Sequence, residues 1–266
     1  FVDKRDDIFM QRNQMPLTTG LADQTPMANV GKMKSFGWDG NIAFTQQIGQ
    51  VNLQLRANFT YQTTDILDKD EAANELWYKM DKGFQLNQSR GFIALGLFKD
   101  QEDIDRSPSQ AGLANKAVLP GDIKYKDVNG DGIINDDDIV PLGYRQQPGL
   151  QYGIGLSANW KNWNLSMLLQ GTGKCDFFVG GNGPHAFHDG RTVEGNRWIP
   201  KEISGTEATE NPNADWPRLT YGNNNMNNRA STFWLHDRKY LRLRNVELSY
   251  DFPQLWTRKF YVNNLR

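Results

Sequence analysis

Apolar and polar residues alternate along several long stretches of this chain. In the clearest stretch, from Val51 to Gln62, every second residue is apolar or aromatic and the residues between are polar. A period of two held over this length predicts a β-strand with one apolar face and one polar face. The residues from Trp38 to Phe44 alternate in the same way, and a short turn near Gln46–Gln50 joins the two stretches into an expected hairpin.

A second hairpin is expected between about residues 150 and 172. Its two strands alternate in the same way, with Lys161-Asn162 as the turn and Trp160 and Trp163 on either side of it. Tryptophan at the end of a long strand is typical of the aromatic girdle of a transmembrane barrel, where the ring lies among the lipid headgroups.

A third hairpin is expected between about residues 233 and 266. Its first strand ends near Tyr250, and the chain returns from about Lys259. The alternation changes phase within the first strand, which predicts a β-bulge near Arg244-Asn245.

The connections between these strands alternate in length. Short turns close the hairpins at about 36–63, 150–172 and 233–266, and long loops occupy about 64–148 and 173–232. Bacterial outer-membrane barrels have short periplasmic turns and long extracellular loops, and their strands need about nine to eleven residues to cross the membrane. The pattern predicts an all-β fold, an antiparallel transmembrane β-barrel fragment with long extracellular loops.

Composition narrows the classes of function. The 266 residues carry a net charge of -1, which gives no electrostatic basis for binding nucleic acid. The mean hydropathy of -0.68 and the lack of a long apolar run exclude a helical membrane protein. Cys175 is the single cysteine, so no intrachain disulfide can form.

The stretch 127–138 carries oxygen-bearing side chains at the spacing of a calcium loop. Gly132 stands at position six, where such a loop turns sharply, and Asp138 closes the loop at position twelve in place of the usual Glu. The predicted ligands of a structural Ca²⁺ ion are Asp127, Asn129, Asp131, Ile133 (through its carbonyl), Asn135 and Asp138. The alternative is a series of Asx turns in which these side chains bond their own backbone without metal.

Several motifs, in a consistent order, resemble the C-terminal half of the barrel in the SusC/RagA family of TonB-dependent outer-membrane transporters. They begin with Asn29–Gly37 and Gly91–Phe98 and continue with Pro120–Gly132, Asn164–Gly171, Thr232–Asp237 and Tyr240–Tyr250. The resemblance covers nearly the whole chain. It implies import of a large nutrient, an oligosaccharide or a peptide, across the outer membrane.

The resemblance also implies partners. A SusD-like surface lipoprotein would cover the extracellular loops, and a TonB complex would supply energy. Six strands cannot close a barrel in outer-membrane lipid, so we expect further strands on both sides and an N-terminal plug domain that is not in this chain. Residues 1–266 would then be part of one barrel, without enzymatic activity.

Two other classes compete with the transporter. A secreted all-β carbohydrate-binding module would keep the calcium-stabilised loop but bury its apolar strand faces between two sheets. A glycosidase fragment would need paired acids, such as Glu102 and Asp103 or the three residues Asp136–Asp138. Neighbours on an extended chain point apart, which argues against a pair that flanks a glycosidic bond.

Histidine and aromatic residues supply weaker signals. His185 and His188 could form half of a metal site, although no cysteine or third histidine lies nearby to complete it. Aromatic residues in or beside the long loops could stack on a sugar, anchor a partner, or pack in a core formed by the loops. They are Trp77, Tyr78, Trp198, Trp216 and Trp234.

Overall fold

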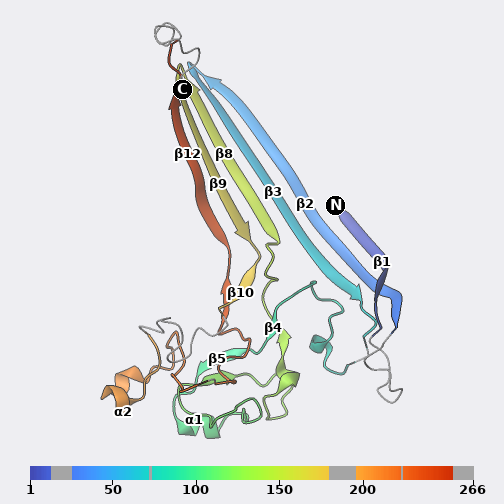
Figure 1. The fold of residues 1–266 in the computed structure, drawn as a ribbon, viewed down its shortest axis with the longest axis vertical. Coiled ribbons are helices and arrows are strands. Elements are labelled where there is room, and N and C mark those ends of the chain that lie inside the picture. Colours follow the sequence, from blue (N-terminus) through green and yellow to red (C-terminus); the bar gives the residue numbers. More distant parts are fainter. Residues whose placement is uncertain (13–25, 72–73, 180–195, 223, 254–266) are drawn as a thin grey trace.

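The computed structural model describes residues 1–12, 26–71, 74–179, 196–222 and 224–253. Its largest part is an antiparallel sheet with the strand order β1-β2-β3-β8-β9-β12. The bounds are β1 (Val2–Gln11), β2 (Met27–Ile48), β3 (Val51–Asp68), β8 (Leu150–Trp160), β9 (Trp163–Gly173) and β12 (Tyr240–Tyr250). Figure 1 shows the long strands side by side, with the shorter elements gathered at one end of the sheet.

Two-residue turns join β2 to β3 and β8 to β9. Gly49 begins the turn between β2 and β3 with a φ of 60°, and Lys161 begins the turn between β8 and β9 with a φ of 53°. Positive φ values match the twist of the flanking strands, which is why short hairpin turns adopt them. The first hairpin extends over Met27–Asp68, beyond the expected 36–63, and the return strand expected from about Lys259 lies outside the described residues.

One face of the sheet is apolar across five strands. Residues that lie directly opposite each other on neighbouring strands share a face of the sheet. The successive strand pairs place one apolar residue from each of β2, β3, β8, β9 and β12 in a single row: Phe44, Leu55, Leu156, Met167 and Val246. We call this side the apolar face. Much of it is open to the surroundings, since other members such as Ile42 and Leu248 are 63% and 64% exposed.

A β-bulge keeps β12 in phase with this face. Leu243 pairs with Leu169, but Asn245 pairs with Leu168, so Arg244 is the extra residue. Without it, the leucines before the bulge and the apolar residues after it would lie on opposite sides of the sheet. The bulge lies where the change of phase predicts it.

Aromatic residues mark both ends of the apolar face. At the turns, Trp160 pairs with Trp163, whose ring centroid lies 4.9 Å from that of Tyr250. At the other end, Trp38 pairs with Tyr61. About ten residues of strand separate the two ends, or about 33 Å along the strand, which a tilt of about 40° reduces to the roughly 25 Å apolar band of a transmembrane barrel.

The two long connections pack together into a small body, which we call the loop body. Its elements are η3 (Trp77–Lys79), β4 (Arg90–Gly91), β5 (Ala94–Leu97), α1 (Gln101–Asp105), β6 (Ile123–Tyr125), η4 (Asp136–Asp138), β7 (Val140–Pro141), β10 (Asp176–Phe178), α2 (Lys201–Ser204), η5 (Glu207–Thr209) and β11 (Leu235–Asp237). No helix among the described residues is long and apolar enough to cross a membrane.

The main hydrophobic core of the structure belongs to the loop body. Phe92, Tyr125 and Ile134 from the first connection pack with Met226 and Trp234 from the second. Backbone bonds join the same two segments, because Phe92 accepts from the amide of Thr232 at 2.9 Å and donates to the carbonyl of Ala230 at 2.9 Å. The two loops therefore fold as one unit at the end of the sheet (Figure 1).

Candidate functional site

The Asp-rich loop, residues 127–138, is built from side chains that accept bonds from nearby backbone amides. The carboxylate of Asp127 accepts from the amides of Gly130 and Gly132 at 2.6 and 2.8 Å. Asn129 and Asp131 each accept from the amide two residues later, at 3.1 and 2.8 Å. These are Asx turns, in which a short polar side chain replaces a backbone acceptor. They fix the sharp curvature that the two glycines make possible.

Asp138, the last residue of this loop, binds backbone amides near both ends of the loop. Its side chain is fully buried, and its two carboxylate oxygens accept from the amides of Val128 at 2.7 Å and Asn135 at 3.0 Å. Asn135 in turn accepts from the amide of Asp137 at 2.6 Å, which completes a capping box on η4. Ile133 lies beside Ser109 in a parallel bridge.

The predicted calcium ligands differ in exposure. Asn129 and Asp131 are exposed, Asp127 is half-buried and Asp138 is buried, and both carboxylate oxygens of Asp127 and of Asp138 accept bonds from backbone amides. Within the described ranges, no three His, Cys, Asp or Glu side chains come together around one point that could hold a metal ion. The calcium site stays a prediction.

The Asp-rich loop is tied to the first connection at η3. The hydroxyl of Tyr78 donates to the carbonyl of Asp137 at 2.9 Å, and Lys79 forms an ion pair with the Asp137 carboxylate. Burial, followed by the negative charges of Asp138 and Asp137, raises the pKa of Tyr78. The hydroxyl therefore stays protonated and keeps donating at neutral pH.

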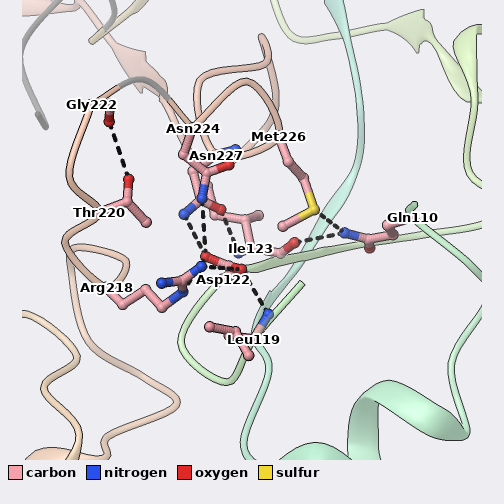
Figure 2. A network of polar contacts seen from close by, with 10 residues as sticks. All are labelled: Gln110, Leu119, Asp122, Ile123, Arg218, Thr220, Gly222, Asn224, Met226 and Asn227. Atoms are coloured by element: carbon pink, nitrogen blue, oxygen red, sulfur yellow. Dashed lines mark hydrogen bonds and ion pairs between the residues drawn. The ribbon is translucent and has the colours of Figure 1, made fainter. Parts of the chain in front are cut away.

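A second polar centre, at Asp122, joins the two halves of the loop body (Figure 2). Asp122 is fully buried, and Arg218 binds its carboxylate through Nε at 2.7 Å and Nη2 at 3.1 Å. The amides of Asn224 and Asn227 donate to the same carboxylate at 3.3 and 2.9 Å. The amide of Leu119 adds a bond at 2.9 Å. A buried charge is tolerated only with such a set of partners.

Gln110 and Tyr125 extend this centre into the core. Gln110 donates to the carbonyl of Ile123 at 3.0 Å and accepts from the amide of Tyr125 at 2.6 Å. The hydroxyl of Tyr125 donates to the carbonyl of Met226 at 2.7 Å, and Trp234 donates to the carbonyl of Asn227 at 2.7 Å. Burial raises the pKa of Tyr125. Each bond satisfies a polar group that the core would otherwise leave unpaired.

Gly121, beside this aspartate, is required by its surroundings. Its φ is 85°, and a β-carbon added there would lie 2.3 Å from the ring of Trp198. Both conditions exclude a larger residue. The motif Pro120–Tyr125, which carries part of the family resemblance, therefore holds the second loop against the first. Its sequence shows the motif but not this role, because the partners of Asp122 lie about a hundred residues away along the chain.

The structure places the other sequence candidates individually. Trp198 and Trp234 are buried in the loop core, Tyr78 is buried in a smaller cluster, and Trp216 packs against Trp234 at 5.8 Å between ring centroids. Trp77 is the exposed member of the five, at 68%. Core packing thus accounts for most of these rings.

Glu102 and Asp103, the first pair of acidic candidates for glycoside cleavage, are both engaged in ion pairs. Glu102 pairs with Arg106, and Asp103 binds Lys124 at 2.7 Å. This hydrogen bond from Lys124 is the main reason why the pKa of Asp103 is lowered. His185 and His188 lie outside the described residues.

The polar face of the sheet lies opposite the apolar one. It carries Arg56 and Asn58 on β3, two glycines at the matching positions of β8, and Gln170 on β9. Arg242 and Arg244 both donate to the Oε1 atom of Gln170, each at 3.2 Å. This face presents amides and cations over the same length on which the other face is apolar.

Comparisons with known proteins agree with this geometry. No protein-family model matches the chain. TonB-dependent receptor P26 of Formosa agariphila is 28% identical over 268 residues, which cover 95% of this chain and 25% of that protein. TonB-dependent receptor P39 of the same organism is 22% identical over 305 residues, which cover all of this chain and 28% of that protein. The chain resembles part of a TonB-dependent receptor.

Solved structures show the same fold. The structure of the RagAB peptide transporter superposes with a TM-score of 0.62 at 17% identity, over 99% of this chain and 27% of that one. The RagAB peptide importer in its open-open state gives a TM-score of 0.58 at 17% identity, over 96% of this chain and 26% of that one. The predicted resemblance and the predicted fold, an antiparallel segment of a transporter barrel, are both confirmed. The chain spans about a quarter of the length of the curated relatives that it matches.

Proposed function

We propose that this chain forms part of the wall of an outer-membrane transporter that imports a large nutrient, an oligosaccharide or a peptide. The observation that carries the proposal is the apolar face, which runs unbroken across five strands and ends in aromatic residues on both sides. The outermost strands of the sheet, β1 and β12, would need further strands to satisfy their edges inside lipid.

This function assigns a side to each surface. The apolar face contacts lipid, and the polar face with Arg56, Arg242 and Arg244 lines the lumen. The short turns at Gly49 and Lys161 lie on the periplasmic side, and the loop body lies outside the cell. The Asp-rich loop is then exposed to the medium, where a structural calcium ion would be available to it.

The names of the similar proteins support the expected partners. Two are TonB-dependent receptors and the solved neighbours are RagAB peptide transporters or importers. We propose that a SusD-like surface lipoprotein covers the loop body of this protein and that a TonB complex supplies the energy for import. The loop body suits a lipoprotein partner because both connections share one hydrophobic core.

A secreted carbohydrate-binding module would cover the apolar strand faces with a second sheet. The short strands of the loop body form only two-stranded sheets, and the described residues leave Trp38, Ile42 and Leu248 at least 63% exposed. An apolar surface of this extent is stable in lipid rather than in water. No feature of the described structure favours the binding module.

Fractionation of the native protein from its source cells tests the proposal. We expect a species far heavier than 30.4 kDa that enters solution only with detergent and comes from the outer membrane together with a lipoprotein. A soluble species near 30.4 kDa would overturn the transporter.

A matched pair of substitutions tests which side meets lipid. Val246 is on the apolar face near its middle, and its neighbour Asn245 is on the polar face. Arginine at a lipid-facing site near the bilayer centre costs about 2–4 kcal/mol, whereas substitutions in the lumen are tolerated. We expect Val246→Arg to reduce the folded barrel in the outer membrane and Asn245→Arg to leave it near the wild-type level. Equal levels of the two variants would contradict the assignment of faces.

A further inference from the structure

The polar face changes character at the end that meets the loop body. Ser35 pairs with Thr64, and their hydroxyls lie 3.0 Å apart. At the next position on the same face, Met33 pairs with Ile66. The polar face therefore becomes apolar at this end of the sheet.

Two strands and a loop segment enlarge this apolar area into a cavity. On β1, Ile8 and Met10 fold over Gly31, where an added β-carbon would lie 2.8 Å from the Met10 sulfur and 3.0 Å from the Ile8 β-carbon. Gly31 therefore makes room for both side chains. The cavity has a volume of about 320 Å³, and its apolar lining consists of Ile8, Met10, Met33, Ile66, Phe84 and Leu86. We call it the mouth cavity.

The loop side of the mouth cavity is held rigidly. Residues 83–86 continue the sheet beside β3: Ile66 donates to the carbonyl of Phe84 at 2.9 Å, and Leu86 donates to the carbonyl of Thr64 at 2.8 Å. Gln85 bridges Asp65 between them, so Phe84 and Leu86 share the face of Thr64 and Ile66. The cavity is preformed, which lowers the entropic cost of filling it.

Charged groups of both signs also line the mouth cavity. Lys32, Lys69 and Arg90 contribute cations, and Asp68 and Asp81 contribute carboxylates. Asp81 is held by Lys69 and by Arg90 Nη2 at 3.0 Å. Arg90 also donates to the carbonyls of residues 78 and 80, at 2.6 and 2.5 Å. Ion pairs and hydrogen bonds therefore hold Asp81 and Arg90 in place beside the apolar side chains of the lining.

This combination selects among the cargo classes open to a transporter. A sugar ring is recognised by a free aromatic face and by convergent polar groups. Among the described residues, the one aromatic ring that lines the cavity is that of Phe84, which already stacks on Trp77 with 5.9 Å between centroids and lies 5.5 Å from the Arg90 guanidinium. A peptide matches better, because its apolar side chain can pack on the apolar lining while its charged or amide groups meet lining residues of both signs.

We propose that the mouth cavity is a cargo subsite that binds an apolar side chain of a peptide. The inference rests on the proposed function, since it takes the polar face as the lumen. The volume lies at the lower end of the range for ligand pockets and suits one or two side chains rather than a whole oligosaccharide. Two methionines in the lining would adapt to side chains of different shape, which an importer of mixed peptides requires.

Methyl NMR of the native protein, labelled with [methyl-¹³C]methionine and purified in detergent, tests the subsite. The tripeptide Gly-Leu-Gly serves as the apolar probe, with Gly-Ser-Gly and maltotriose as comparisons. We expect Gly-Leu-Gly to shift the resonances of Met10 and Met33. Met167 on the apolar face and Met226 in the loop core report on unrelated surroundings and should stay unchanged. Equal shifts with either comparison compound, or no shift with Gly-Leu-Gly, would overturn the subsite.

Substitution provides a second readout. Met33→Gln places an amide in the apolar interior, and we expect it to weaken Gly-Leu-Gly binding about tenfold or more. The control is Met27→Gln, because Met27 is on the same strand but is 50% exposed and outside the cavity. Unchanged binding in the Met33 variant would refute the subsite.

The two proposals fail in different ways. If the wild-type protein fractionates with the outer membrane but Gly-Leu-Gly does not shift the methyl resonances of Met10 and Met33, the subsite is contradicted and the transporter proposal is unaffected. A soluble wild-type protein would overturn both.

Discussion

Removal of the buried carboxylate at Asp122 is the sharpest test of how the loop body is held together. Asp122→Ala leaves the guanidinium of Arg218, whose side chain is 14% exposed, without its bidentate partner. It also removes the acceptor for three other donors, among them the side-chain amides of Asn224 and Asn227. Breaking a buried ion pair from one side costs about 3–5 kcal/mol. We expect the loop body to lose stability by that amount.

Limited proteolysis of the native protein measures this loss. When opening and closing are fast relative to cleavage, the rate follows the population of the open form, so about 3–5 kcal/mol corresponds to cleavage faster by about two to nearly four orders of magnitude. We expect the new cleavages in the loop body and not in β2, β3, β8 or β9, since the sheet has its own ladder of bonds.

Two control variants make the result specific. Asp136→Ala removes a carboxylate that is 72% exposed and 3.9 Å from Arg229, and should change the rate little. The double variant Asp122→Ala/Arg218→Ala removes the stranded charge and should be cleaved more slowly than Asp122→Ala alone. A cleavage rate for Asp122→Ala equal to that of Asp136→Ala would refute the role of this centre.

Three further predictions follow from other parts of the molecule. Deleting Arg244 removes the bulge of β12 and turns Leu241 and Leu243 to the polar face. We therefore expect heat-modifiability gels to show less folded protein in the outer membrane. A normal amount of folded protein would show that the bulge is dispensable. Chelation of divalent cations should increase protease cleavage within residues 127–138 without unfolding the barrel, and equal cleavage with and without chelator would argue against bound calcium. Burial raises the pKa of Tyr125 above its ordinary value of 10.0, so the folded state holds its proton more tightly than the unfolded state. Stability of the loop body should therefore be constant below about pH 10 and fall above it, and hydrogen exchange in Tyr125→Phe should show a weaker fall; an identical fall in both proteins would contradict this assignment.

The sequence alone determined the parts of this protein that depend on local periodicity. Alternation from Val51 to Gln62 fixes which side chains share a face, because a strand repeats every two residues whatever it pairs with. The bulge near Arg244 follows from the same rule, since one extra residue is the only way to keep the leucines on one side. The aromatic ends and the unequal connections were readable for the same reason.

Tertiary structure decided what depends on contacts between distant segments. The burial of Asp122 with Arg218 and the core position of Trp234 arise because two connections that read as separate loops share one core. The mouth cavity needs β1, β2, β3 and residues 83–86 to converge, and no single segment carries that arrangement in its own pattern. Local alternation selects the faces of a strand, whereas the free energy of burying distant side chains together selects what those faces enclose.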